Sequence, residues 1–520
     1  MTRSTSRARP LAAVVLALPL LGVGCASLRA DGLWALPPHE PPPLDAPPAP
    51  VALTAALGSA CLAELGPRWL EGAGPLQLSH VLASVAEAYP LLSAARQEQV
   101  LADAKQLSAL GAFDLQLRGG AAWAPEGYYE HNTADASLRQ RTGLWGLEVW
   151  GGYRLGAGDF DPTWDGKRVT NHGGEVRAGA SLPLLRDGEI DGARRDLLAS
   201  TLDREIAASE VALRRLRFDQ EAAIAYWRWV AAGRRLRVAD ELLELAQVRQ
   251  QGIEGRVRRG DLPELEAQDN RRLVLRRRGL QVGARRELEK AVLGLSLFLR
   301  DERGQPLRAP ASALPGRFPD PARPDLQGLA LDLEAALRQR PDLRQLAQRL
   351  GRAGVDLRYT QNQRLPRLDF SVSASQDLDR SRPSVTKGEF ELVAGFELSF
   401  PVQNRAAEGK LLASRAELER LAEQERYLRD KVEAEVRDAL SALHAAWERA
   451  DQARQAAELA RVLAAAERRR FELGEVNVLT LNLREEAAAE AELQRIGALL
   501  EYWASTADYR RAVGAAPAPR

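Results

Sequence analysis

Two stretches of the chain run from an alternating strand pattern straight into a helical pattern: GGEVRAGASLPLLRDGEIDGARRDLLAS at residues 173–200 and GEFELVAGFELSFPVQNRAAEGKLLAS at residues 388–414. In each, apolar and polar residues alternate until a proline, Pro183 or Pro401, ends the alternation. A polar turn follows, and then a run rich in Ala, Leu, Arg and Glu that is typical of a long helix. The two prolines lie about 218 residues apart, so the sequence predicts two copies of one structural unit.

The composition excludes several classes of function. With 520 residues and 45% hydrophobic content, the chain is long enough to bury a large core. Its 72 basic and 71 acidic residues give a net charge of +1, which does not favour nucleic-acid binding. The five histidines show no metal-ligand spacing, and neither a phosphate-binding loop nor a nucleophile elbow occurs. We therefore expect no enzyme activity and no cofactor.

The N-terminus has the pattern of a secretory signal, predicted over residues 1–24. Arginines precede an apolar run of roughly 13 residues, which is too short to span a bilayer. Small residues before Cys25 resemble a bacterial lipobox, so the pattern predicts that this cysteine carries lipid chains; Gly22 departs from the leucine usual at its position. The alternative is an ordinary signal peptide with an incidental cysteine. If Cys25 is acylated, the other cysteine, Cys61, would have no disulfide partner.

Residues 25–70 are predicted to form a tether. This segment contains ALPPHEPPPLDAPPAPVAL, and such a density of proline favours an extended polyproline II chain without a core of its own. A lipid-anchored tether of this kind would hold the folded part of the chain at a membrane surface.

The predicted strands have one apolar and one polar face. In the second unit the apolar face carries Phe390, Leu392, Ala394, Phe396, Leu398 and Phe400. A soluble sheet on a core is one explanation. Strands of about 10 residues and a group of tryptophans favour a transmembrane β-barrel; these tryptophans are Trp123, Trp145, Trp150 and Trp164. Four clear strands cannot close a barrel, because about eight are needed, so several chains would have to contribute. The alternating segment Trp145 to Leu155 has no counterpart in the second unit, and its place stays open.

The helical runs are too long for a compact domain. Apolar residues recur at spacings of three, four or seven from Leu411 to Leu443, which predicts a coiled-coil seam. Each long helix ends at a glycine, Gly260 or Gly474, and a second helix returns. Each unit is thus predicted to contain a strand pair and a long helical hairpin. The first unit spans residues 71–300 (strands about 113–184, hairpin about 190–296). An equatorial linker spans 301–330, and the second unit spans 331–520 (strands about 366–402, hairpin about 406–513).

This layout resembles the TolC-like outer-membrane factors of efflux pumps and type I secretion systems. The resemblance rests on the duplication, on the Ser-x-Pro junctions, on RPDLRQLAQRLGRAGVDLRYTQNQRLPRLDFSVSAS at residues 340–375, and on RRFELGEVNVLTLNLREEAAAEAELQRIGALLEYWASTADYRRAVG at residues 469–514. It covers nearly the whole chain after the proline-rich tether. The resemblance implies a homotrimer in which each chain gives four strands to a twelve-stranded transmembrane barrel. The helices would continue that barrel as an α-helical tunnel through the periplasm.

The resemblance also assigns a role to the two glycine tips, which would gate the tunnel and dock a periplasmic adaptor. The residues implied are Arg259, Gly260, Asp261, Glu266, Asp269, Arg470, Gly474 and Glu475. The family tends to carry an acidic residue six positions after the tip glycine. Glu266 fits this pattern, whereas Thr480 takes that position in the second tip. Arg258 and Arg469 could join the neighbouring arginines in pairing with another hairpin, although such residues are more often solvated.

Taken together, the sequence predicts a lipid-anchored channel of the bacterial outer membrane, with most of the chain in the periplasm. It would act as a passive exit duct joined through an adaptor, the membrane fusion protein, to an inner-membrane pump of the RND or ABC type. The alternative is a lipid-anchored, coiled-coil periplasmic spacer without a pore. The apolar face from Phe390 to Phe400 distinguishes the two, because only the channel needs it to contact lipid.

Overall fold

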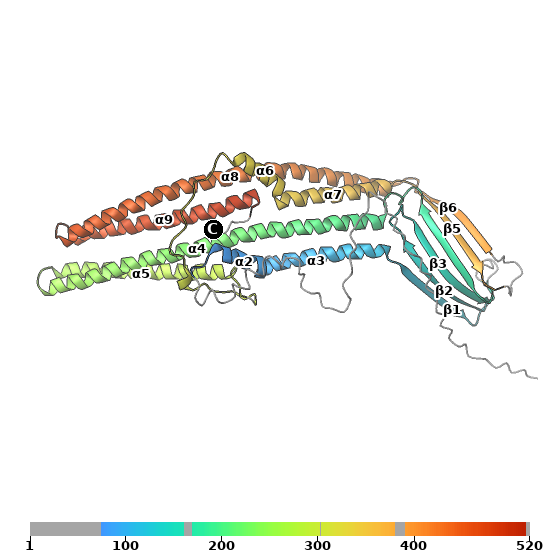
Figure 1. The fold of residues 1–520 in the computed structure, drawn as a ribbon, viewed down its shortest axis with the longest axis horizontal. Helices are drawn as coiled ribbons and strands as arrows, with labels where there is room; N and C mark the ends of the chain where they lie inside the picture. Colours follow the sequence, from blue (N-terminus) through green and yellow to red (C-terminus); the bar gives the residue numbers. More distant parts are fainter. Residues whose placement is uncertain (1–73, 161–168, 302, 380–389, 516–520) are drawn as a thin grey trace, which may run out of the picture. The chain divides into compact units, whose positions relative to one another are not determined.

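The computed structural model describes residues 74–160, 169–301, 303–379 and 390–515. The predicted signal (1–24), Cys25 and the tether (25–70) lie outside the described residues. Helices make up most of the described chain (Figure 1). In chain order they are α2 (Leu78–Ala88), α3 (Pro90–Leu110), α4 (Gly192–Arg258), α5 (Glu264–Ser296), α6 (Leu329–Gln339), α7 (Pro341–Asn362), α8 (Arg405–Glu472) and α9 (Val478–Val513).

Helices α4 and α8 are the two long helices, with 67 and 68 residues. At a rise of 1.5 Å per residue each is about 100 Å long. Neither contains proline, and the side chain of Asp191 caps α4 by accepting from the Arg194 amide at 2.8 Å. The expected apolar seam of α8 is buried at Leu411, Leu421, Val432, Val436, Leu440 and Leu443, and half-buried at Leu418 and Leu428. In the described ranges, no helix combines the length and the apolar character that a bilayer-spanning helix needs.

Each long helix is accompanied by shorter helices along its length. The first half of α4 packs on α3 and α7, and its second half packs on α5 and α9 (Figure 1). Ion pairs mark these contacts, with Arg214 of α4 meeting Glu98 of α3 at 3.0 Å and Arg195 meeting Asp356 of α7 at 2.7 Å. Helix α8 packs in the same way on α6, α7 and α9. The two halves of the chain therefore share one helical layout.

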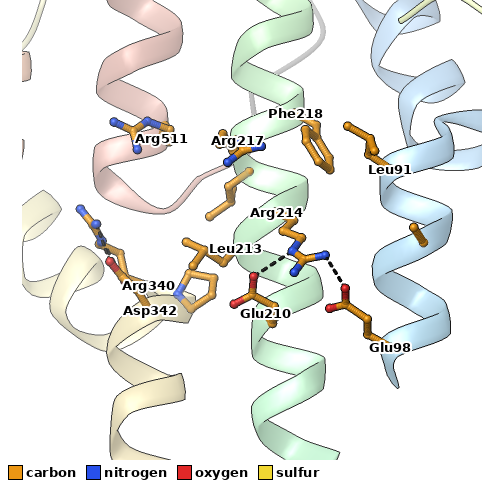
Figure 2. Close-up of a pocket in the computed structure, with 13 residues that line it drawn as sticks. Leu91, Glu98, Glu210, Leu213, Arg214, Arg217, Phe218, Arg340, Asp342 and Arg511 are labelled. Carbon is orange, nitrogen blue, oxygen red and sulfur yellow. Dashed lines mark hydrogen bonds and ion pairs between the residues drawn. The ribbon is translucent and has the colours of Figure 1, made fainter. Parts of the chain in front are cut away.

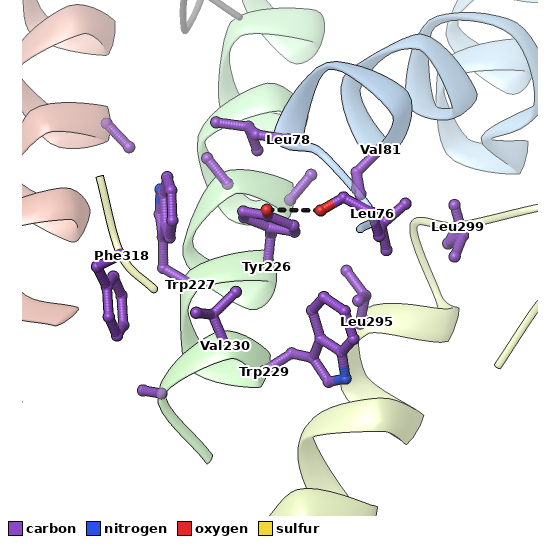
Figure 3. Close-up of a cluster of buried hydrophobic side chains, with 14 of the residues drawn as sticks. Leu76, Leu78, Val81, Tyr226, Trp227, Trp229, Val230, Leu295, Leu299 and Phe318 are labelled. Atoms are coloured by element: carbon purple, nitrogen blue, oxygen red, sulfur yellow. Dashed lines mark hydrogen bonds between the residues drawn. The ribbon is translucent and has the colours of Figure 1, made fainter. Parts of the chain in front are cut away.

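The largest hydrophobic core lies midway along α4, where α2, the end of α5 and the linker after it meet. Figure 3 shows Tyr226, Trp227 and Trp229 of α4 in this core, and the Tyr226 hydroxyl donates to the Leu76 carbonyl at 2.8 Å. Linker residue Leu314 lies over Gly233, where an added Cβ would stand 2.3 Å from a Leu314 methyl. The linker is therefore packed into the fold, and Gly233 is needed for that close approach.

A buried carboxyl beside this core leads to a prediction on pH dependence. Asp219 of α4 is 3% exposed, and one of its oxygens has no hydrogen-bond partner in the described chain. Burial raises the pKa of this carboxyl from the usual 3.8 to about 6, although Arg215 lies 3.7 Å away. Because the folded state favours the protonated form, this group lowers stability as pH rises from about 4 through 6.

Asp219→Asn is therefore expected to stabilise the protein at pH 7 by about 2–3 kcal/mol, since the substitution removes the cost of the buried charge. At pH 4 the variant and the parent should have the same stability. Denaturant midpoints measured at both pH values provide the test. A loss of stability at pH 7 would mean that the pairing with Arg215 outweighs desolvation.

The strands form one antiparallel sheet in the order β1-β2-β3-β4-β5-β6 (Figure 1). They are β1 (Gln116–Ala124), β2 (His131–Arg141), β3 (Glu148–Gly158), β4 (Glu175–Pro183), β5 (Arg367–Asp377) and β6 (Phe390–Ser399). The expectation of four strands per chain was thus wrong, because the described chain has six. The two additional strands are β2 and β3, and β3 contains most of the segment Trp145 to Leu155, which the sequence did not place.

One face of this sheet is apolar in all six strands. The registers put on this face Leu117, Ala121 and Trp123 of β1, Ala134, Ala136 and Leu138 of β2, Val149, Tyr153 and Leu155 of β3, Val176, Ala178, Ala180 and Leu182 of β4, Leu368, Phe370, Val372 and Ala374 of β5, and Phe390, Leu392, Ala394, Phe396 and Leu398 of β6. No charged residue of these strands lies on it, and its uncharged polar residues with long side chains, Asn132, Gln140 and Gln376, are each second from an end of their strand. Hereafter this is the apolar face, and the opposite side is the polar face.

The tryptophans are distributed differently from a simple girdle. Trp123 lies on the apolar face near the end of β1, whereas Trp145 is in the β2–β3 turn. Trp150 lies on the polar face, where the guanidinium of Arg177 stands 5.4 Å from its ring centre. Trp164 is outside the described residues. Trp150 therefore makes a cation–π contact with a charged neighbour on that face.

Candidate functional site

The two hairpin tips have the same local geometry. Gly260 and Gly474 adopt positive φ angles of +82° and +80°, the left-handed conformation that glycine adopts without strain. At the first tip the amides of Gly260 and Asp261 donate to carbonyls of the last α4 turn, both at 2.9 Å. At the second tip Gly474 and Glu475 make the corresponding bonds to α8, at 3.0 and 2.9 Å. Each tip is thus a Schellman motif that ends one long helix and reverses the chain.

The charged tip residues pair within their own tips. Arg259 meets Asp261 at 3.1 Å, and Arg470 meets Glu475 at 3.3 Å, in both cases across the tip glycine. All four side chains are at least half exposed, so each pair contributes little to stability. Each of these two arginines therefore forms an ion pair within its own hairpin.

The helices that return from the tips begin differently. Glu266 lies half-buried in the first turn of α5, next to its positive end, while Asp269 is exposed and stands 3.7 Å from Arg272. At the second tip the Asn477 side chain caps α9 by accepting from the Thr480 amide at 2.9 Å. Thr480 is thus part of a neutral cap. The first turn of α5 thus carries acidic residues, and the first turn of α9 carries none.

A substitution at the tips tests the need for a left-handed residue. Gly260→Val or Gly474→Val would force a β-branched residue into a positive φ, at a cost of about 1–3 kcal/mol per tip. We expect the assembled protein to persist while export and tip conductance fall. Gly252→Val is the matched control, because Gly252 lies inside α4 with helical φ and open space around it. Normal export from both tip variants would remove these glycines from the functional site.

Behind the tips, a buried ionic cluster links all four hairpin helices. Glu485 of α9 is its centre, with a side chain only 2% exposed. It accepts from Arg249 of α4 at 2.5 Å, from Arg277 of α5 at 3.3 Å and from Arg468 of α8 at 3.3 Å. Asn482 also accepts from Arg249. Both Arg249 and Glu485 lie about eleven residues from their tip glycines, or about 16 Å along the helices. We call this set the four-helix cluster.

The electrostatics of the four-helix cluster are unbalanced. Arg249 and Arg277 are 9% and 4% exposed, so two nearly buried cations share one buried carboxylate. Burial lowers the pKa of Arg277, because desolvation penalises its charged form. The second bond of Arg277, to the Leu242 carbonyl at 2.8 Å, satisfies another of its donors. Within the four-helix cluster, one carboxylate thus pairs with arginines of both hairpins.

The sequence analysis did not find this cluster. Glu485 stands in the run REEAAAEAE, where its neighbour Glu486 has the same side chain. Only the helix packing separates them: Glu485 is buried, while Glu486 pairs with Arg276 at 2.5 Å on an exposed surface. A charged residue among small alanines was the available signal, but alternating Glu and Ala on a helix is also typical of a solvated face.

The two strand-to-helix junctions each begin at a proline. Pro183 is the last residue of β4, and Pro401 follows β6. Arg194, 6% exposed, donates to the carbonyls of Asp187 and Gly188 at 2.5 and 2.8 Å and so holds the first turn. A left-handed residue occurs in each turn, Asp187 in the first and Asn404 in the second. In both junctions, a residue in the left-handed conformation therefore occurs where the chain turns from strand to helix.

Both junctions also form hydrogen bonds with residues at or just after the end of α7. The Asp187 amide donates to Asn362 at 2.7 Å, and the Asn404 side chain donates to the Arg364 carbonyl at 3.0 Å. Arg364 in turn meets Glu408 of α8 at 2.9 Å. The segment between α7 and β5 thus connects the two repeats where strands become helices.

A cavity of about 680 Å³ lies between α3, α4 and α7 (Figure 2). In it Arg214 bridges Glu98, at 3.0 Å, and Glu210, at 2.8 Å, and Glu210 also accepts from Gln345 at 2.8 Å. Arg340 on the opposite wall pairs with Asp342 at 2.6 Å. These charges are thus already paired, and two of the contacts join α4 to its neighbours, through Glu98 of α3 and Gln345 of α7. The lining therefore supports packing of the helices. No group of three His, Cys, Asp or Glu that could hold a metal ion occurs in the described ranges.

The comparisons with known proteins concern the fold. No protein-family model matches the chain, and no curated protein matches it. Among solved structures it is similar to the CmeC outer membrane channel of Campylobacter jejuni, with a TM-score of 0.57 and 14% identity over 84% of this chain and 85% of that chain. For the VceC outer membrane protein of Vibrio cholerae the TM-score is 0.57 and the identity 16%, over 84% of this chain and 96% of that chain. For the open-state MtrE outer membrane channel of Neisseria gonorrhoeae the TM-score is 0.57 and the identity 15%, over 85% of this chain and 89% of that chain. At these identities the likeness establishes the fold, and it confirms at that level the resemblance found in the sequence.

Proposed function

We propose, from the fold that this chain shares with TolC-like outer-membrane factors, that it forms the outer-membrane exit channel of a tripartite efflux or type I secretion system. The observation that carries the proposal is the continuous apolar face of its six-stranded sheet. The channel is passive, and the driving force comes from an inner-membrane pump of the RND or ABC type.

Nothing in the described chain covers the apolar face. The hydrophobic core clusters contain no strand residue, and no helix makes an extensive contact with the sheet. Phe390, Leu392, Phe396 and Leu398 of β6 are all at least 60% exposed. So large an exposed patch marks a surface that contacts something apolar. The strands are nine to eleven residues long, which suits a tilted strand crossing a bilayer. These features support lipid as the neighbour of this face.

The proposal requires more than one chain. A sheet of six strands has two open edges, β1 and β6, and unpaired strand edges are not tolerated in lipid. Since the strands alternate in direction, β6 of one chain and β1 of the next would pair antiparallel, and the ring could close. The family resemblance supports a homotrimer. The helical hairpins would then surround a tunnel, with their tips in contact with a periplasmic adaptor.

The proposed location is the outer membrane, with the chain anchored through acylated Cys25 and the hairpins in the periplasm. This part rests on the lipobox-like sequence and on the proline-rich tether. Metabolic labelling with a fatty acid tests it: the parent should incorporate label, and Cys25→Ser should not. Incorporation that survives in Cys25→Ser would place the lipid elsewhere.

Two measurements on one detergent-solubilised preparation test the proposed function. One is the conductance of the protein in planar bilayers, and the other is the mass of the assembly. We expect a trimer with a small conductance, limited by the tips, and a weak cation preference, because only α5, and not α9, has acidic residues in the first turn after its tip. A monomer without conductance would favour the lipid-anchored spacer instead. The uncovered apolar face argues against that alternative, since a soluble sheet would need to bury it.

A further inference from the structure

The β2–β3 hairpin has no equivalent in the second half of the chain. Strands β1 and β4 connect to helices α3 and α4, and β5 and β6 connect to α7 and α8. Strands β2 and β3 connect only to other strands. The hairpin is therefore an insertion between the two strands that the first repeat shares with the second. It could extend the wall of the channel or form a separate structure beside it.

The register makes the hairpin part of the wall. Every residue of β1 pairs with β2, and β3 pairs with β4 from Glu148↔Ser181 to Arg154↔Glu175. The apolar residues of the hairpin, such as Ala136 and Leu155, share the apolar face with those of β6. Its charged residues share the polar face, where Arg139 meets Glu148 and Arg154 meets Glu175, both at 2.6 Å. A hairpin outside the barrel wall would not require its apolar and polar faces to continue those of the four other strands.

The turn of the β2–β3 hairpin also packs closely against the first strand-to-helix junction. The loop between Arg141 and Glu148 contains a β-turn with Trp145 and Gly146 at positive φ, in which the Leu147 amide donates to the Leu144 carbonyl at 2.9 Å. At Gly146 an added Cβ would lie 2.8 Å from both Pro183 and the Asp187 carbonyl. The turn is thus pressed against the end of β4. It occupies the rim of the sheet at the point where no helix continues the strands.

We propose that β2 and β3 are transmembrane wall strands, and that three copies of this chain close a barrel of eighteen strands. This proposal rests on the proposed function. The partner at each open edge is a second copy of the chain: β6 carries Glu391 and Glu397 on the polar face, and β1 carries Arg118 on the same face. A β6–β1 pair between chains would therefore bring opposite charges together in a strand pair that also continues the apolar face.

The consequence is a wider lumen in the membrane than the helical part of the channel has. Barrel diameter grows roughly linearly with strand number, so eighteen strands give about 1.5 times the diameter of twelve. The helices that continue the strands remain four per chain, α3, α4, α7 and α8. The barrel would no longer limit passage, and selection by size would fall to the helical tunnel and its tips.

Single cysteines with a fluorescent NBD label test where the hairpin lies. In a Cys61→Ser background, Ala136→Cys and Leu155→Cys place the label on the apolar face of β2 and β3, and Ser137→Cys places it on the polar face. The full-length trimer is reconstituted in phosphatidylcholine vesicles with doxyl-labelled lipid, and the signal of the Cys61→Ser background is subtracted. We expect the doxyl lipid to quench the first two labels at least about twofold more strongly than the third, because successive strand residues face opposite sides.

Two controls separate this proposal from the proposed function. Leu392→Cys on the apolar face of β6 should be quenched, and Ser373→Cys on the polar face of β5 should not. Quenching at Leu392→Cys without quenching at Ala136→Cys and Leu155→Cys would overturn the eighteen-stranded wall and leave the channel intact. Absence of quenching at Leu392→Cys as well would overturn the channel itself. In a reconstruction of the trimer from particle images, eighteen strands are expected, and twelve would overturn the proposal.

Discussion

Phe396→Arg is expected to abolish assembly of the protein in the outer membrane. Phe396 lies near the middle of β6 on the apolar face, where it is 70% exposed and its ring stands 5.0 Å from that of Phe370. An arginine facing lipid at the bilayer midplane costs about 2–4 kcal/mol in a barrel, and a trimer carries three copies. The total approaches the whole stability of a folded domain. Trimers that resist heat in detergent should therefore be lost from outer-membrane fractions.

Val393→Arg is the matched control for this prediction. Val393 lies three residues away on the same strand, is 47% exposed and faces the polar side together with Glu391 and Glu397. An arginine there would face water beside Glu391, its neighbour two residues away on the same face, so the trimer should form at close to the parent level. If Phe396→Arg also yielded heat-resistant outer-membrane trimers, the apolar face would not contact lipid, and the proposed channel would lose its main support.

Glu485→Gln is expected to loosen the two helical hairpins from one another. The substitution keeps the size of the side chain but removes the only carboxylate of the four-helix cluster, so Arg249 and Arg277 lose the buried carboxylate that both contact. Removing one partner of a buried ion pair costs about 3–5 kcal/mol, because the remaining charge stays desolvated. Amide hydrogen exchange should rise along α4, α5, α8 and α9 on the tip side of the cluster. Single-channel conductance should rise with it.

Glu486→Gln provides the control one residue along the helix. Glu486 pairs with Arg276, and both side chains are about half exposed, so losing this pair should cost at most about 1 kcal/mol. The two variants differ in burial and not in chemistry. Equal exchange in Glu485→Gln and the parent would mean that the hairpins are held by apolar packing, and that the four-helix cluster does not set their position.

The repeat and the helical hairpins could be predicted because their signals are local. Alternation up to Pro183 and Pro401, uninterrupted helical runs and the glycines at the tips each follow from backbone conformations that nearby residues impose. The same reasoning located Gly260 and Gly474, which the structure places at positive φ. The functions assigned to the tips remain proposals.

The additional hairpin was found only in part: the alternating segment Trp145 to Leu155 covers most of β3 but was not placed, and β2 has a weak local signal. Strand β2 reads HNTADASLRQR, with small and polar residues instead of the β-branched and aromatic residues that strands favour, and β3 contains Gly151 and Gly152. An added Cβ at Gly152 would lie 2.6 Å from the Ala136 carbonyl, so this glycine serves close pairing between the two strands. Only pairing with β1 and β4 on either side makes these segments strands.

The sequence alone determined the duplicated order of strands and helices, the positions of their turns and the presence of one apolar face, since these depend on periodicity and on residues next to one another in the chain. Tertiary structure alone decided that six strands form one sheet and that Glu485, rather than Glu486, joins four helices. The physical reason is that both outcomes depend on partners far away in the chain. Arg249 and Arg277 lie more than 200 residues from Glu485, and β4 joins the strands of the two repeats by pairing with β5 of the second repeat. No pattern within a single helix or strand specifies those partners.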